Sequence, residues 1–232
     1  MALPVIKHPT YKITIPSTKK EVNIRPFTVQ EEKILLMAKS SENTADIVSA
    51  VKQVIRNCII EPVDVDAMAT FDIEYIFIKL RAKSVGEIVD LEYADPETED
   101  VIKFKINLDD VEIKYNPEHT NKINVFDDVG IVMRYPTLEE IEKVESTSEK
   151  SEEAAFNMLM KCIETIYDAN NVYSDYSDKE LTDFIDSLPM ESMNKVKQFF
   201  DTMPSVEHEV NLKSKDGKTK KITLKGITSF FT

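Results

Sequence analysis

The sequence predicts an α+β fold: an N-terminal hairpin, a helical lobe, a central antiparallel sheet, a second helical lobe and a C-terminal β-hairpin. Apolar residues recur at helical spacing in some segments and at every second position in others, and turn residues separate these segments. Helices and strands therefore occupy separate blocks, unlike the alternation of a wound parallel sheet. We expect three parts, residues 1–86, 87–136 and 137–232.

In the first part, alternating residues on either side of a Pro-Ser-Thr-Lys turn predict a hairpin, and apolar residues at helical spacing predict three helices after it. The first helix starts with a capping box, because Thr28 and Glu31 stand three residues apart at its beginning. The strands and helices are expected at 10–15, 21–24, 28–40, 45–59 and 71–81.

In the second part the period changes to two, which predicts short strands that together form an antiparallel sheet. A second capping box, Thr137 with Glu140, then starts a helix, and we interpret the polar stretch 146–153 as a mobile connection. The cleanest amphipathic stripe of the chain follows and predicts a helix over 154–166. The strands of the second part are expected at 87–93, 101–106, 111–115, 123–126 and 129–133.

Two further helices and a hairpin complete the third part. Ser177 and Glu180 form another capping box, and Pro189 stands where the first turn of a helix accepts proline. Predicted strands at 206–212 and 220–224 flank Asp216-Gly217, a dipeptide that favours a tight hairpin turn.

Composition disfavours several classes of function. The 232 residues include 42 acidic and 29 basic ones, and the net charge of −13 repels phosphate backbones, which disfavours nucleic-acid binding. The 4 glycines are too dispersed for a Walker loop or a dinucleotide-binding fingerprint. Since no apolar run reaches about 18 residues and the N-terminus lacks a signal-peptide pattern, the chain is expected to be soluble, unsecreted and without a membrane partner.

No catalytic or metal-binding motif stands out. Glu207-His208-Glu209 could hold a metal only with ligands from elsewhere, and an exposed strand is the favoured interpretation. Cys58 and Cys162 lie in apolar helical patterns without a cationic or histidine motif, so we interpret them as buried free thiols. Solvated faces and turns account for the many acidic pairs. The sequence therefore predicts no cofactor and no metal.

The last hairpin is a basic island in an acidic chain. Its lysines could meet an acidic protein surface or nucleic acid, and a solvated hairpin is an equal alternative; without interleaved aromatic residues, a protein partner is favoured over nucleic acid. The two terminal phenylalanines either pack on the protein's own core or anchor another chain. The candidate partner-binding residues here are Lys218, Lys220, Lys221, Phe230 and Phe231.

Four segments form a recognisable series: RPFTVQEEKILLMA at 25–38, FDIEYIFIKLRAKSVGE at 71–87, INVFDDVGIVMRYPT at 123–137 and LKGITSFF at 224–231. In this order they resemble the baseplate hub proteins of T-even type tailed bacteriophages, a family of hub subunits and hub-assembly factors. The resemblance implies a viral structural or assembly role without catalysis. It also implies partners among other baseplate and hub proteins, and a location in the virion tail or, during assembly, in the host cytoplasm.

Two details of the matched segments concern sites. Relatives often carry a cysteine pair in the last hairpin, but NLKSKDGKTKKITLKG contains no thiol or histidine, so zinc binding is not implied here. Arg25, Pro26, Phe27 and Arg81 are candidate partner-binding residues. A structural role is equally expected, in which the two arginines pair with acids such as Glu31 and tie the first hairpin to the helices.

The leading hypothesis is a non-enzymatic hub component or hub-assembly chaperone that acts through protein–protein contacts. One alternative is a metal-free hydrolase or transferase that uses a pair of carboxylates. Another is a nucleic-acid adaptor that uses the basic C-terminal hairpin.

Overall fold

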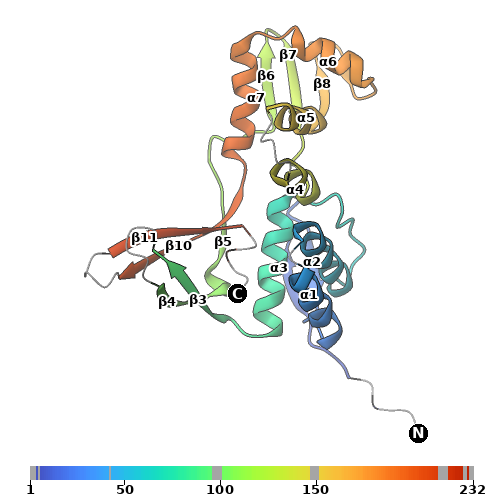
Figure 1. Cartoon of the computed structure of the whole chain (residues 1–232). Helices are drawn as coiled ribbons and strands as arrows, with labels where there is room; N and C mark the ends of the chain where they lie inside the picture. The colour runs from blue at the N-terminus through green and yellow to red at the C-terminus, as the bar shows by residue number, and fades with distance from the viewer. Residues whose placement is uncertain are drawn as a thin grey trace. The chain divides into compact units, whose positions relative to one another are not determined.

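The computed structural model describes residues 4, 6–41, 43–95, 101–146, 152–213, 219–226 and 229. The chain folds into two compact units (Figure 1). Unit 1 comprises Met1–Lys114 and Ser205–Thr232, and unit 2 comprises Tyr115–Pro204. The three-part division expected from the sequence stays a prediction.

Unit 1 contains both helices and strands. Its strands form three antiparallel sheets: β1 with β2, β3 with β4, and β5 with β10 and β11. Its first elements are β1 (Tyr11–Thr14), β2 (Glu21–Ile24), α1 (Val29–Ser41), α2 (Thr44–Cys58) and α3 (Thr70–Ser84). The remaining elements are β3 (Ile88–Ala94), β4 (Val101–Asn107), the short 3-10 helix η1 (Leu108–Asp110), β5 (Glu112–Lys114), β10 (Ser205–Lys213) and β11 (Thr219–Lys225).

Unit 2 contains one antiparallel sheet in the order β6-β7-β8-β9, with helices packed on it. Its elements are β6 (Lys122–Phe126), β7 (Val129–Met133), α4 (Leu138–Ser146), α5 (Glu152–Lys161), β8 (Ile163–Tyr167), β9 (Val172–Tyr173), α6 (Asp178–Asp186) and α7 (Met190–Thr202). The predicted α+β class is therefore confirmed, since helices and antiparallel sheets occupy separate stretches of both units.

Helix α3 lies in the core of unit 1. Its apolar residues point in several directions, and α2, η1, β5 and β10 all pack against it. Phe71, Ile73, Ile76, Phe77, Ile78 and Leu80 are almost completely buried. Helix α3 is thus buried on several sides, and a helix with apolar residues on several sides is stable only when it is enclosed.

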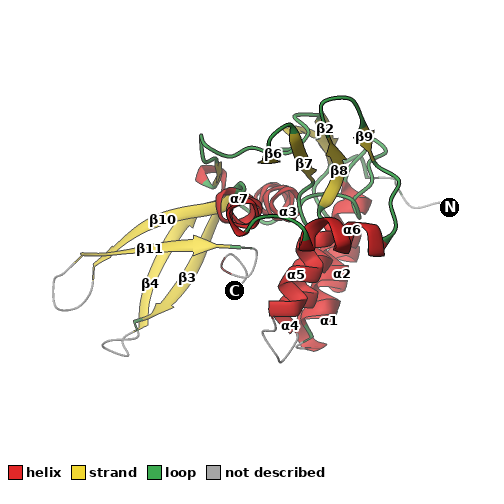
Figure 2. Ribbon diagram, turned by 90° about the horizontal axis from the view of Figure 1, so that it is seen from above, coloured by secondary structure: helices red, strands yellow, loops and turns green. Residues whose placement is uncertain are grey.

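The single central sheet expected over residues 87–136 is not formed. Its strands divide among three sheets: β3 and β4 pair with each other, β5 pairs with β10, and β6 and β7 pair with β8. Figure 2 shows the β3–β4 hairpin beside the β10–β11 hairpin, to which it is linked through Lys220 and Asp95. Period-2 patterning predicts strands but does not specify their partners.

The helix expected over 154–166 is correct only in its first part. Helix α5 ends at Lys161, and Ile163–Tyr167 form strand β8, which pairs with β7. Three of these five residues are β-branched, and strand pairing buries Ile163 and Ile166 in the core of unit 2. Gly130 permits the close pairing, since a Cβ atom there would lie 2.2 Å from the ring of Tyr167.

The other predicted elements lie within a few residues of their expected bounds, whereas η1 and β9 have no counterpart among the predictions. The polar stretch 146–153 and the Asp216-Gly217 turn fall mainly or wholly outside the described residues.

Candidate protein-interaction sites

Arg25 and Glu31 form a charged contact at the junction of β2 and α1. The Nη2 of Arg25 donates to Oε1 of Glu31 at 2.9 Å, while the N–H and hydroxyl of Thr28 donate to Oε2 at 2.8 and 2.6 Å. Burial leaves the Glu31 side chain 2% exposed and opposes its ionisation. The hydrogen bonds from Arg25 and Thr28 outweigh this cost and lower the pKa of Glu31 to about 2.

Arg134 and Glu140 repeat this contact at the junction of β7 and α4. The Nη2 and Nη1 of Arg134 donate to the two carboxylate oxygens of Glu140 at 2.7 and 2.9 Å, and the N–H of Thr137 donates to Oε2 at 2.9 Å. The hydrogen bond from Arg134 is the main reason that the pKa of Glu140 falls to about 2. We name each arrangement of Arg, Thr and Glu an Arg–Glu clamp.

A cysteine belongs to each clamp. The backbone N–H of Arg25 donates to the carbonyl of Cys58 at 2.9 Å, and that of Arg134 donates to the carbonyl of Cys162 at 2.8 Å. Both cysteines stand at the end of the second helix of their unit and are buried free thiols, as the sequence predicts. Burial raises the pKa of Cys58 to about 11 and that of Cys162 to about 12. At neutral pH both groups are therefore protonated and weakly nucleophilic.

A later helix is fastened to the hairpin in both units. Asp72, the third residue of α3, accepts hydrogen bonds from the N–H and hydroxyl of Ser17 in the β1–β2 turn. Ser192, the third residue of α7, donates its hydroxyl to the carbonyl of Val125 in β6. Each unit thus contains the same series of hairpin, Arg–Glu clamp, two helices, cysteine and fastened helix.

The capping boxes, considered one at a time, do not reveal this internal repeat. The signal is the pattern Arg-x-x-Thr-x-x-Glu, which occurs at Arg25 and at Arg134, followed in each case by Cys-Ile at the end of the second helix. The unit 2 copy has a shorter pair of helices and an additional helix, α6, before the fastened one.

The other candidate residues from the first matched segments are partly buried. Pro26 and Phe27 connect β2 to α1; the carbonyl of Pro26 accepts from Nη1 of Arg25, and the N–H of Phe27 donates to the hydroxyl of Ser84. Arg81 lies on α3, where burial lowers the pKa of its guanidinium. The structure thus brings Arg25, Pro26 and Phe27 together at the clamp.

Three lysines of the C-terminal hairpin, Lys220, Lys221 and Lys225, lie in ion pairs within unit 1. Lys220 is 2.7 Å from Asp95, whose side chain is completely buried, and Lys221 is 2.7 Å from the exposed Glu209. Glu207 lies 3.3 Å from both Lys114 and Lys225. The glutamates of β10 therefore offset much of the positive charge. The other three candidates, Lys218, Phe230 and Phe231, lie outside the described residues.

The described part of the chain lacks the features of a metal site and of a membrane-spanning helix. No group of three potential metal-ligating side chains occurs there, and Glu207 lies in ion pairs with Lys114 and Lys225. In the same residues, no helix has both the length and the apolar character that crossing a membrane requires.

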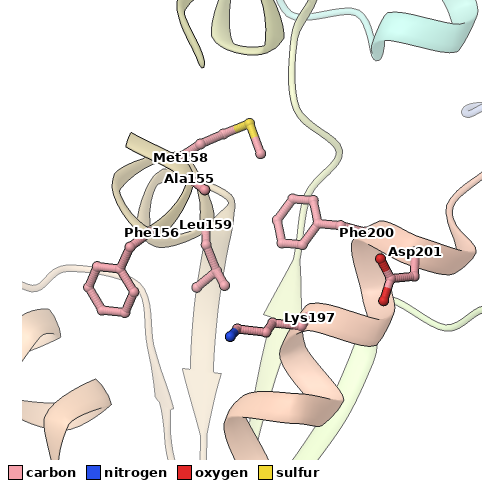
Figure 3. A pocket seen from close by; sticks show the side chains of 7 residues that line it. All are labelled: Ala155, Phe156, Met158, Leu159, Lys197, Phe200 and Asp201. Atoms are coloured by element: carbon pink, nitrogen blue, oxygen red, sulfur yellow. The ribbon is translucent and has the colours of Figure 1, made fainter. Parts of the chain in front are cut away.

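An apolar cavity of about 680 Å³ lies between α5 and α7 of unit 2. Figure 3 shows Phe200 and Lys197 extending from α7 toward α5, and Leu159 extending from α5 toward α7. Ala155, Phe156, Met158 and Asp201 complete the lining. The sequence pattern does not indicate this cavity, because the amphipathic stripe of α5 predicts a buried face without showing how well that face is covered.

Comparison with known proteins identifies the family. The chain matches the family described as T4 bacteriophage base plate protein over residues 8–232, nearly its whole length. No curated protein and no solved structure matches it. The match includes all four segments on which the resemblance was based and both Arg–Glu clamps. The chain therefore belongs to the T4 bacteriophage base plate protein family.

Proposed function

We propose that the chain is a non-enzymatic component of the baseplate hub or a chaperone of hub assembly, and that it acts through protein–protein contacts. The family match over residues 8–232 carries this proposal. The hub assignment comes from the resemblance of the four segments to hub proteins. The family description itself names a base plate protein and no more specific role.

The surroundings of the buried carboxylates support a role without catalysis. Among the described residues, Glu31, Asp72 and Asp95 are the buried acids, and each has a structural partner. Arg25 holds Glu31, Ser17 holds Asp72 and Lys220 holds Asp95. A general acid and base would instead need two carboxyl groups that face a common substrate site. None of these three carboxylates therefore favours the carboxylate hydrolase.

The charge distribution favours a protein partner over nucleic acid. Lys220 and Lys221 are engaged by acids of their own unit, so fewer cations of the hairpin are available for phosphate contacts. Such a hairpin has charges of both signs across its two strands, an arrangement that suits a specific protein surface better than a uniform polyanion.

Mass spectrometry of purified virions and of immature tail intermediates tests the proposal. A resident hub subunit is expected in both samples at a constant ratio to a known tail protein. A chaperone is expected in the intermediates and is depleted from virions. If the chain is missing from both samples although it is expressed during infection, the proposed function is wrong.

A screen for turnover of ester, phosphate and glycoside substrates addresses catalysis separately. We expect no activity that depends on Glu31, Asp72 or Asp95. Turnover that disappears when one of these carboxylates is replaced, while the fold is retained, would contradict the non-enzymatic role.

A further inference from the structure

The internal repeat makes it possible to compare the same helix face in the two units. Counted back from Cys58 and Cys162, positions −7, −4 and −3 are equivalent. In unit 1 these residues are Val51, Val54 and Ile55, and all three are 0% exposed. Helix α3 packs directly against this helix, α2. The face is therefore closed within unit 1.

In unit 2 the equivalent face is open. The residues at positions −7, −4 and −3 are Ala155, Met158 and Leu159, and all three line the cavity between α5 and α7. Ala155 is exposed, Met158 is half-buried and only Leu159 is buried. Phe200 of α7 borders the same cavity and is also half-buried. A helix face that is buried in one copy of the repeat is thus left accessible in the other copy.

The walls of the cavity indicate which backbone conformation fits. Both walls are helices, whose backbone groups already bond within the helix, so an extended segment finds no strand edge with which to pair. An amphipathic helix needs only an apolar groove, into which it inserts side chains spaced three and four residues apart. The cavity therefore suits the apolar face of a helix.

The charge of unit 2 indicates the polar face of that helix. Residues 115–204 include 19 acidic and 8 basic residues, a net charge of −11, whereas the whole chain carries −13. Unit 2, which contains the cavity, therefore carries almost all of the chain's excess negative charge. A partner segment with lysine or arginine on its polar face is attracted by this field, and an acidic one is repelled.

We propose that the cavity between α5 and α7 is the docking site for a basic amphipathic helix of another baseplate protein. The identity of the partner as a baseplate protein rests on the proposed function. The chemistry of the docked segment rests on the geometry and charge of unit 2.

A designed peptide tests the chemistry of the site on the full chain. The probe is a 14-residue peptide of leucine and lysine with leucine at helical spacing, labelled for fluorescence anisotropy. We expect saturable binding to the protein. Replacing lysine by glutamate in the probe, or placing proline at its centre, is expected to weaken binding at least about tenfold, through charge repulsion and loss of the helix respectively.

A pair of matched variants locates the site. Ala155→Arg places a long cation in the cavity, while Asn157→Arg places the same side chain at an exposed position of α5 that does not line it. We expect Ala155→Arg to weaken probe binding at least about tenfold and Asn157→Arg to change it less than about threefold. Lys197→Glu removes a cation from the cavity wall and is expected to strengthen binding, which keeps the test valid if Ala155→Arg fails to fold.

Photocrosslinking in tail intermediates identifies the partner. With benzoylphenylalanine in place of Ala155, we expect a crosslink to a helical segment of a baseplate protein that carries net positive charge. A crosslink to a second copy of this chain, or to an acidic segment, would overturn the proposal. So would equal probe binding by Ala155→Arg and Asn157→Arg together with no effect of Lys197→Glu.

The outcomes separate the two proposals. If the chain is found in tail intermediates or virions and Ala155→Arg assembles as well as the unchanged protein, the docking site is wrong while the proposed function stands. If the chain is found in neither sample, the proposed function fails even when the peptide binds at the cavity.

Discussion

Arg134 holds Glu140 through two parallel hydrogen bonds at the point where β7 passes into α4. The same guanidinium donates to the carbonyl of Tyr135, and the backbone N–H of Arg134 reaches the end of α5 at Cys162. One residue thus connects a strand, the start of one helix and the end of the next. Arg25 makes the equivalent contacts in unit 1, so the clamp is a recurring way of joining a hairpin to a pair of helices.

Glu31→Ala is expected to destabilise unit 1 by about 3 kcal/mol, because it leaves the guanidinium of Arg25 without its anion and the N–H of Thr28 without its acceptor. Glu32→Ala is the control, since Glu32 is the exposed neighbour on the same helix turn. It should change stability by less than about 0.5 kcal/mol. Urea denaturation of both variants measures the difference, and equal stabilities would show that the clamp is dispensable.

The clamps predict a loss of stability in acid. The pKa of Glu31 and of Glu140 is about 2 in the folded protein, against a usual value of 4.5. Because the folded state prefers the ionised carboxylates, their contribution to the free energy of unfolding is complete above pH 4.5 and disappears as the pH falls toward 2. Denaturation midpoints between pH 7 and pH 3 should decline less steeply in Glu31→Gln/Glu140→Gln than in the unchanged protein. Parallel declines would contradict the assignment.

The two thiols should be unreactive in the folded protein. Burial keeps Cys58 and Cys162 protonated, since it raises their pKa values to about 11 and about 12. Titration with a disulfide reagent at pH 8 is expected to detect no fast-reacting thiol before unfolding and two thiols in denaturant. Rapid modification of either cysteine in the native protein would show that the end of its helix opens.

Lys220 should contribute to stability more than Lys221. Replacing Lys220 by alanine leaves the buried carboxylate of Asp95 without this ion pair and is expected to cost about 3 kcal/mol. Lys221→Ala removes an exposed pair with Glu209 and should cost less than about 1 kcal/mol. Thermal melting distinguishes the two. If Lys220→Ala melts normally but assembles poorly, Lys220 contacts a partner, as first predicted from the sequence.

The two terminal phenylalanines are predicted to contact a partner. Replacing Phe230 and Phe231 by alanine is expected to weaken partner assembly by more than about 2 kcal/mol while leaving the fold intact, as for aromatic anchors of an interface. Calorimetry and co-assembly with tail intermediates measure the two effects. A large drop in melting temperature would place both rings in the protein's own core.

The sequence by itself determined the elements whose signals are local. The capping boxes at Thr28, Thr137 and Ser177 marked the starts of helices, because a side chain bonds backbone amides only three residues away. Alternation likewise predicted the β3–β4 and β10–β11 hairpins, whose strands are neighbours along the chain. The family resemblance also came from the sequence, and the base plate family is confirmed.

Tertiary structure decided what depends on distant residues. It ended α5 at Lys161 and made Ile163–Tyr167 a strand, because pairing with β7 outweighed an apolar pattern that suits either conformation. It paired β5 with β10, although residues 115–204 separate the two strands in the sequence, and among the described residues it left Ala155 of the cavity between α5 and α7 exposed. Local spacing specifies hydrogen bonds within a few residues, whereas strand partners and helix packing depend on the whole chain.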